Sequence, residues 1–373
     1  MLSRNIACFS QSRSGDTYEC VTVLTHNAYV ELVPLSQWQD PEKRHRETVR
    51  AAHERDEAAL LDLLAVYLST KSRKRSQISP KTLTAYSLAL RDYLAWVWPK
   101  DSPGPNFSIL KATSDDLDRY VADLQSHGGH LSDRAPLVPA TIASYLAGVR
   151  AFYRALAWAG AASPLTVSAP PDPTPPEERR PALPAALYQQ LLARLSSNTP
   201  QDLRDRVAVR LLGETGLRIS ELCSLNTDDV DLKERILLVK RGKGGKSRSV
   251  PLAPGLSSDL GLWQRERLAY ALPGEKAFLV NLGGRKASGR RLSPSMLRKI
   301  LAGYYQELGF PERYHGAHML RHTAGTRIYR GTRDLHVTAR ILGHQNLNTS
   351  AIYAKMDLEG LRQTIDQLED EDS

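Results

Sequence analysis

Seven prolines fall within residues 166–184, and no other stretch of the chain limits its fold as strongly. Proline fixes φ and has no backbone N–H, so a segment this rich in it is extended and fairly stiff, and it cannot join a packed core. We therefore expect a linker here, with a separate domain on each side. A length of 373 residues is typical of two domains with connecting pieces.

Before the linker, helical periodicity runs from about Glu57 to Gly160. Four amphipathic helices are predicted, the first with leucines four residues apart and the others beginning after Ser79, Thr113 and Val138. Four short helices form a compact bundle, so we expect a helical domain at residues 55–165. The role of residues 1–54 stays open. Within them, short strands are expected at 21–24 and 29–33, and a solvated helix or tether at 42–55.

After the linker, residues 185–360 combine helical patterns with one β-hairpin. The fold class expected for the whole chain is mainly α with a small β-sheet. A C-terminal helix and acidic tail are expected at residues 361–373. Within the second domain we predict helices at 185–195, 201–212, 256–271 and 293–308, and strands at 235–241 and 247–252 around the hairpin tip 242–246.

A cluster of polar residues begins at His318. His318 and Arg321 are three residues apart, so in a helix they lie on one face and can contact the same ligand. Gly331 and the Thr-Arg-Asp that follows it end this helix. Asp334 is then a suitable cap for the next one.

The second of these helices ends at Leu342-Gly343, which places His344 at its C-terminal end. Asn348 or Thr349 is expected to cap a short helix that carries Tyr353. His, Arg, His and Tyr are thus presented on successive short helices joined by tight turns. Such a group of cations with a phenol is suited to a phosphate that will be attacked.

The chain is basic, with 50 Lys and Arg against 41 Asp and Glu. Residues 185–360 alone hold 28 Lys and Arg against 16 Asp and Glu. This balance indicates an anionic partner, most simply nucleic acid, although a solubilising surface explains charge alone equally well. The cations we expect to follow a phosphate backbone lie in the helical domain and the hairpin: Lys71, Arg73, Lys74, Arg75, Lys81, Arg91, Arg150, Lys240, Arg241 and Lys246.

The offsets from Arg321 to His344 and from His344 to Tyr353 resemble the second signature box of the tyrosine recombinases, the phage integrase family. Residues 215–222, TGLRISEL, resemble the first box, and Gly242-Lys243-Gly244 resembles the site of the active lysine. The resemblance covers about 185–360 by motif and 55–165 by architecture, and it is strongest to the bacterial Xer-type recombinases. It implies a SAM-like core-binding domain and a catalytic domain that close around DNA as a C-shaped clamp.

The chemistry of these residues suits that resemblance. A phenol with a pKa of ~10 must lose its proton to attack, and the transition state gathers negative charge on phosphate oxygens. The planar fork of arginine can hold two such oxygens. We therefore expect Arg218, Arg321 and His344 to hold the phosphate.

The resemblance further implies that Tyr353 becomes joined to the 3′-phosphate of DNA. His318 is then the expected acceptor or relay of its proton, and Lys243 the acid for the leaving 5′-oxygen. Lys240 and Lys246 are the alternatives to Lys243. Glu221 is expected to orient Arg218, whose simpler interpretation is an ion pair with Glu221, Asp228 or Asp229.

No cofactor is expected, because the phosphotyrosine conserves the energy of the broken bond. No GxxxxGK[ST] motif is present in the sequence. His318 and His322 have a spacing used by zinc sites, but no glutamate follows His318, so no metal is predicted. His315, His322 and His336 are interpreted as surface or packing residues.

The partners expected from the resemblance are double-stranded DNA at specific recombination sites and other protomers, in a homo- or hetero-tetramer. The need for a second recombinase or an accessory protein stays open. So does the choice between dimer resolution of chromosomes or plasmids and integration of a mobile element. Two alternatives for the activity are a type IB topoisomerase and a DNA-binding relative without activity.

Three scattered cysteines, Cys8, Cys20 and Cys223, form neither a disulfide framework nor a zinc pattern. They fit a reducing cytosol. No run reaches the ~18 apolar residues that a membrane span needs. The expected location is the cytoplasm.

Overall fold

The structure is a computed structural model. It describes residues 9–11, 17–24, 30–34, 36–72, 78–131, 135–175, 181–197, 199–240, 247–283, 288–344 and 348–355, with side chains described from Trp38 onward except at 348, 349, 352 and 355. The chain divides into two compact units, Met1–Pro173 and Thr174–Ser373. This division lies inside the proline-rich segment.

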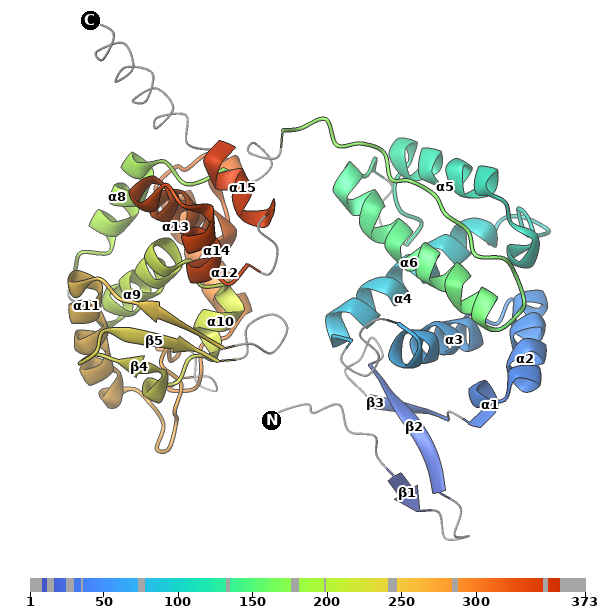
Figure 1. The fold of residues 1–373 in the computed structure, drawn as a ribbon, viewed down its shortest axis with the longest axis horizontal. Coiled ribbons are helices and arrows are strands. Elements are labelled where there is room, and N and C mark those ends of the chain that lie inside the picture. Colours follow the sequence, from blue (N-terminus) through green and yellow to red (C-terminus); the bar gives the residue numbers. More distant parts are fainter. Residues whose placement is uncertain are drawn as a thin grey trace, which may run out of the picture. The chain divides into compact units, whose positions relative to one another are not determined.

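The first unit is a helical bundle whose four main helices lie at the predicted places (Figure 1). Ser79 accepts a hydrogen bond from the amide of Thr82 at the start of the second, as a cap followed by proline predicts. The helices of this unit are α1 (Ser36–Gln39), α2 (Pro41–Glu54), α3 (Glu57–Thr70), α4 (Pro80–Val97), η2 (Ile109–Lys111), α5 (Ser114–Ser126) and α6 (Pro139–Trp158).

Aromatic side chains fill the centre of this bundle. Tyr93, Tyr120 and Tyr153 come from α4, α5 and α6, and all three are fully buried. The hydroxyls of Tyr93 and Tyr153 are 2.6 Å apart, and that of Tyr120 donates to the buried carboxylate of Asp92. Each buried phenol hydroxyl therefore has a partner, as burial of a polar group requires.

The N-terminal residues form a three-stranded antiparallel sheet in the order β1-β2-β3. Two of the strands were expected, and β1 was not. Their bounds are β1 (Phe9–Gln11), β2 (Thr17–Leu24) and β3 (Val30–Pro34). The charged stretch that follows is the helix α2, whose N-terminus is capped by the side chain of Asp40.

The second unit contains a short sheet surrounded by helices (Figure 1). Its strands β4 (Val230–Asp231), β5 (Ile236–Val239) and β6 (Arg248–Pro251) pair antiparallel in that order, and the two-residue β4 was not predicted. The helices are α8 (Ala185–Arg194), α9 (Pro200–Thr215), α10 (Ile219–Ser224), η3 (Thr227–Asp229), α11 (Pro254–Glu266), η4 (Arg267–Ala269), α12 (Pro294–Glu307), η5 (Glu312–Tyr314), α13 (Ala317–Thr332), α14 (Leu335–Leu342) and α15 (Asn348–Lys355).

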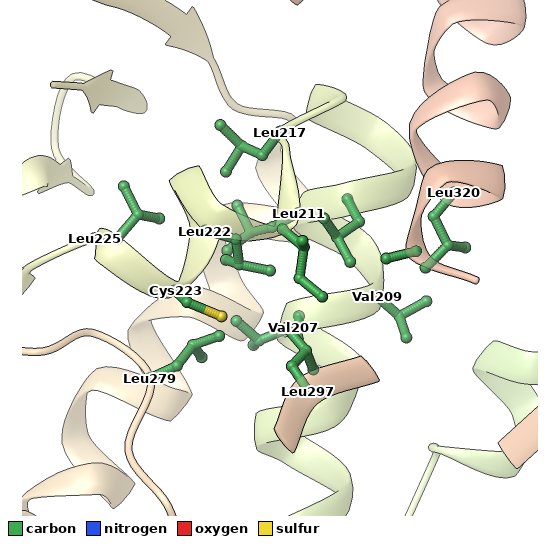
Figure 2. Packing of buried hydrophobic residues seen from close by; sticks show 14 of the residues in the cluster. Val207, Val209, Leu211, Leu217, Leu222, Cys223, Leu225, Leu279, Leu297 and Leu320 are labelled. Carbon is green, nitrogen blue, oxygen red and sulfur yellow. The ribbon is translucent and has the colours of Figure 1, made fainter. Parts of the chain in front are cut away.

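The core of the second unit is packed around α9 (Figure 2). Leu211 of α9, Leu222 of α10, Leu297 of α12 and Leu320 of α13 are each at most 1% exposed. Leu320 immediately precedes Arg321, so the packing that buries α13 against α9 also fixes the position of that arginine. The mainly α fold with a small sheet is confirmed. Within the described residues, no helix is both long and apolar enough to cross a membrane.

Candidate active site

The first part of the site is the turn between α9 and α10. Gly216 ends α9 with φ of 66°, a left-handed conformation that glycine adopts without steric cost. A Cβ there would also collide with the side chain of Leu342. Two residues later, Arg218 occupies the N-cap position, immediately before α10. Its amide donates to Oε2 of Glu221 at 2.9 Å, and its Nη1 donates to Oε1 at 2.9 Å.

Glu221 is held by a second arginine, Arg248, which the sequence analysis did not identify. Nη1 and Nη2 of Arg248 donate to the two oxygens of Glu221 at 3.1 and 2.9 Å. Its Nε donates to the carbonyl of Ile341, near the end of α14, at 3.1 Å. Arg248 begins β6, so it ties the sheet to both α10 and α14.

Arg321 connects the same two regions from α13. It is 6% exposed, its Nη1 donates to the carbonyl of Gly216, and its Nη2 donates to that of Leu342 at 2.8 Å. Burial lowers the pKa of Arg321 to about 10, with a further contribution from the charge of Arg218. The guanidinium therefore stays charged at neutral pH while it also satisfies a backbone carbonyl at the end of α14.

The end of α14 turns sharply at Gly343, whose φ is 68°. The amide of His344 then donates to the carbonyl of Ala339 at 2.9 Å, which closes the turn in the usual C-terminal pattern. Nδ1 of His344 is 2.7 Å from Oγ of Ser350, which belongs to α15 and is fully buried. Two guanidinium groups and one turn thus fix where His344 lies.

Tyr353 lies one turn after Ser350 on α15, and it is 1% exposed. Its ring stacks on that of His344, with centroids 6.1 Å apart and an angle of 11° between the planes. The ring also covers Gly325 of α13, where a Cβ would collide with Cζ and Cε1 of the phenol. Helices α13, α14 and α15 pack against one another in this part of the unit (Figure 1).

The charges of the site act on one another. Burial lowers the pKa of His344 to about 4, with contributions from Arg321, Arg218, His322 and Arg248. Burial raises the pKa of Tyr353, while Arg321 and Arg218 partly oppose this. At neutral pH the imidazole is therefore neutral and the phenol is protonated.

Burial would by itself raise the pKa of Glu221, but the hydrogen bonds from Arg248 and Arg218 lower it to about 2. The carboxylate is therefore charged at neutral pH. It holds Arg218 and Arg248, whose charges both act on Arg321.

Two family models match the chain. The model of the phage integrase family covers residues 182–359, and that of the phage integrase N-terminal SAM-like domain covers residues 67–160. The tyrosine recombinase XerC of Chlorobaculum parvum is 30% identical over 328 residues, which are 83% of this chain and 95% of that protein. The tyrosine recombinase XerA of Thermococcus kodakarensis is 31% identical over 285 residues, 76% of this chain and 88% of that protein.

The chain belongs to the tyrosine recombinases, the phage integrase family. It is a site-specific recombinase and therefore an enzyme, and neither a relaxing topoisomerase nor an inactive relative is favoured. The resemblance stated from the sequence is confirmed.

Solved structures agree in fold. A post-cleavage complex of the XerH site-specific recombinase bound to a palindromic difH substrate covers 90% of this chain and 92% of that chain, with a TM-score of 0.63 and 21% identity. The Tn1549 transposon integrase in complex with transposon right end DNA covers 83% of this chain and 99% of that chain, with a TM-score of 0.61 and 20% identity.

The structure of this tyrosine recombinase brings Arg218, Arg321, His344 and Tyr353 together, as the preceding contacts describe. His318 lies exposed in the first turn of α13, one turn before Arg321. Lys243 and the rest of the hairpin tip lie outside the described residues, as do the C-terminal helix and tail at 361–373. So do five of the expected DNA-binding cations: Arg73, Lys74, Arg75, Arg241 and Lys246.

The described cations expected to contact DNA differ in their surroundings. Lys71 and Lys81 are exposed. Arg91 forms an ion pair with Glu57 at 3.0 Å, Arg150 donates to the carbonyl of Val167, and Lys240 pairs with the buried Asp229 at 2.5 Å. Lys240 therefore already neutralises a carboxylate. Contacts of any of these cations with DNA stay predictions.

Sequence reasoning missed Arg248, Ser350 and Gly325. Arg248 gave no local signal, because it lies 27 residues from its partner Glu221 in the sequence. Ser350 is three residues before Tyr353, a spacing that puts both on one face of a helix. Gly325 lies within α13, where an interior glycine often marks a close approach.

Proposed function

We propose that this tyrosine recombinase binds double-stranded DNA at specific sites, and cleaves and rejoins its strands through a 3′-phosphotyrosine at Tyr353. The observation that carries the proposal is the meeting of Arg218, Arg321, His344 and Tyr353, which come from four separate elements. Both guanidinium charges act on the phenol and on the imidazole. A phosphate placed among them would face donors that are already oriented.

The two arginines are suited to different parts of the phosphate. Arg218 is 26% exposed, and the described contact of its side chain uses only Nη1, so Nε and Nη2 are available for a ligand. Arg321 uses one N–H of each Nη on the backbone and keeps further N–H groups. We assign Arg218 and Arg321 to the non-bridging oxygens, with Glu221 and Arg248 holding Arg218 in place. His344 supplies a neutral donor.

The first half of the reaction transfers a phosphoryl group of DNA from the 5′-oxygen to Tyr353. The Oη of Tyr353 forms a bond to phosphorus as the bond from phosphorus to the 5′-oxygen breaks. His318 takes the phenolic proton directly or through water, and Lys243 gives a proton to the departing 5′-oxygen. In the second half the 5′-hydroxyl of another strand attacks the phosphotyrosine, and each proton returns.

This scheme needs neither a metal ion nor ATP. The phosphotyrosine ester keeps the energy of the bond that was broken, so rejoining needs no further source of energy. Charge that a metal ion would otherwise neutralise falls to Arg218 and Arg321. We keep independence from metals and ATP as part of the proposal.

We further propose that residues 55–165 form the core-binding domain and residues 185–360 the catalytic domain, joined by the linker at 166–184. Together they close on DNA as a C-shaped clamp, within a tetramer on two duplexes. Lys71 and Lys81 are the described cations best suited to the phosphate backbone, because both are exposed. The cytoplasm stays the predicted location.

Covalent capture tests the proposal. The protein is incubated with a library of nicked duplexes, in which the short cleaved strand diffuses away and leaves the protein joined to DNA. Wild type is expected to give a denaturant-resistant adduct, and sequencing the captured DNA identifies the site. Tyr353→Phe, which removes only the nucleophilic oxygen, is expected to bind the same DNA and give no adduct.

The matched control is Tyr305→Phe, since Tyr305 is also fully buried in this unit but lies outside the site. This variant should still form the adduct. An adduct that survives Tyr353→Phe would contradict the assignment of the nucleophile. Absence of any adduct with wild type, together with intact DNA binding, would contradict the proposed reaction.

A further inference from the structure

The contact between His344 and Ser350 gives the site a feature beyond its catalytic groups. Oγ of Ser350 is 2.7 Å from Nδ1 of His344, and Ser350 is fully buried on α15. A hydroxyl can donate or accept, and so can Nδ1, depending on the tautomer of the ring. The direction of this one hydrogen bond therefore decides which nitrogen of His344 carries its proton.

The imidazole has a single proton to place. Arg321 and His322 of α13, Arg218 before α10 and Arg248 of β6 all disfavour a charged ring, and burial adds to their effect. Tyr353 covers one side of the ring as a neutral phenol. A neutral imidazole has one N–H and one lone pair, so it can donate to a phosphate from one nitrogen only.

The two tautomers have opposite consequences at Nε2. If Nδ1 carried the proton and donated to Ser350, Nε2 would present a lone pair to an anionic oxygen and repel it. If Ser350 donates, Nδ1 accepts and Nε2 carries the proton. Only this second arrangement makes the ring a hydrogen-bond donor from the nitrogen that Ser350 leaves open.

We propose that Ser350 is a positioning residue: its hydroxyl donates to Nδ1 of His344 and holds the ring as the Nε2–H tautomer that can donate to the scissile phosphate. The inference rests on the proposed function, because it assigns that phosphate as the acceptor. The partner of a histidine's second nitrogen commonly fixes its tautomer and orientation in this way.

The same contact links the histidine to the nucleophile. Ser350 and Tyr353 are three residues apart on α15, so they lie on one face of that helix and move together. When α15 is in place, the phenol is beside His344 and the hydroxyl is on Nδ1. When α15 moves away, His344 loses the phenol of Tyr353 and the hydroxyl of Ser350 at once. The Nε2–H tautomer is therefore fixed only while the nucleophile is in place.

The first measurement needs no DNA. In the full chain labelled with ¹⁵N-histidine, long-range proton–nitrogen NMR spectra distinguish protonated from unprotonated ring nitrogens, and His344→Gln identifies the signals of His344. We expect Nε2 to be protonated and Nδ1 to be unprotonated at neutral pH. Ser350→Ala should give a mixture of tautomers, and Ser350→Thr should restore the single form. A ring with Nδ1 protonated in wild type would overturn the inference.

The second measurement is single-turnover cleavage of the captured duplex. Ser350→Ala is expected to lower the cleavage rate by about 10- to 100-fold, and Ser350→Thr to restore most of it. Ser258→Ala is the control for loss of a serine hydroxyl from a helix of the same unit, because Ser258 lies on α11 and its hydroxyl donates to the carbonyl of Pro254. That variant should cleave like wild type.

A double variant separates positioning from general stability. If Ser350 acts through His344, adding Ser350→Ala to His344→Gln should not lower the rate further. A further loss of the same 10- to 100-fold in the double variant would overturn the inference and leave a structural role. Failure of wild type to form any adduct would instead contradict the proposed function, whereas the NMR result would stand by itself.

Discussion

The two arginines that meet at Tyr353 are held in opposite ways. Arg218 is partly exposed and is oriented by a carboxylate, Glu221, that lies three residues away. Arg321 is buried, and its described contacts are to backbone carbonyls 105 and 21 residues away in the sequence. A guanidinium that is hydrogen-bonded to a nearby carboxylate, as in Arg218, is oriented by neighbouring residues. A guanidinium that is hydrogen-bonded to carbonyls far away in the sequence, as in Arg321, also holds the elements that carry those carbonyls together.

This difference separates two roles within one site. Arg218 can be removed and Glu221 still keeps Arg248 as its partner. Removal of Arg321 leaves the carbonyls of Gly216 and Leu342 without that donor, at the turn before Arg218 and at the turn before His344. We therefore expect Arg218 to contribute only to the reaction. We expect Arg321 to contribute both to the reaction and to the stability of the folded structure.

Arg321→Ala should have the largest effect. Loss of a charged donor is expected to lower cleavage by about 10²–10³-fold, by analogy with oxyanion-hole donors. Each buried carbonyl left unpaired should cost about 1–3 kcal/mol of unfolding free energy. Covalent capture measures the first effect and urea unfolding the second. Arg321→Lys keeps the charge without the fork, and its full recovery of both properties would contradict the double role.

Arg218→Ala should lower cleavage by a similar 10²–10³-fold but leave stability nearly unchanged. The expected change in unfolding free energy is within about 1 kcal/mol, because Glu221 keeps its two hydrogen bonds from Arg248. DNA binding, measured at a fixed salt concentration, should be largely retained. A loss of stability equal to that of Arg321→Ala would remove the distinction between the two arginines.

Local sequence signals predicted the first unit well. The helices α4 and α6 begin at Pro80 and Pro139, each after the residue expected to cap or precede it, because a proline start and a period of 3.6 residues are both local. The acidic start of α5 likewise follows directly from its sequence. In the second unit, by contrast, the two-residue strand β4 was missed, since so short a strand has no measurable alternation.

The site was predicted only as far as its motifs extend. The offsets from Arg321 to His344 and from His344 to Tyr353, together with the separate box that contains Arg218, pointed to one phosphate. The structure places these four residues together. Their supporting contacts were not predictable, because Arg248 reaches Glu221 over 27 residues and Ile341 over 93. Such pairings depend on how β6 packs beside α10 and α14, which no local pattern records.

Glu221→Gln tests how far the carboxylate itself supports Arg218 and Arg248. The folded-state pKa of Glu221 is about 2, below the ~4.3 of an unfolded chain, so its contribution to stability is present above pH ~4.3 and is lost as the pH falls through about 2. That contribution is about 3 kcal/mol at neutral pH. Urea unfolding should show a lower unfolding free energy for the variant than for wild type at pH 7. Hydrogen exchange should show lower protection in α9 and α10.

The deficit of Glu221→Gln should shrink at pH 3, because wild type then begins to lose the same charge. Glu307→Gln provides the control, since the pair of Glu307 with Arg194 is exposed and such pairs contribute little. A deficit that is equal at both pH values would show that shape, and not charge, makes Glu221 important. The orientation of Arg218 would then have to come from something other than the charge of Glu221.

Gly325→Ala should have the smallest effect and tests the Arg321 side of the comparison one turn further along α13. An added Cβ cannot coexist with the phenol where it now lies, so α15 has to shift. Overpacking of this kind costs about 1–3 kcal/mol, and the displaced Oη should form the adduct more slowly. Gly303→Ala is the matched control, because Gly303 is an exposed helical glycine with open space around it, and alanine there should stabilise by about 0.5–1 kcal/mol. If Gly325→Ala also stabilised the protein and left adduct formation unchanged, Tyr353 would not depend on α13 for its position. The structural role of α13 in the site would then be restricted to the hydrogen bonds of Arg321.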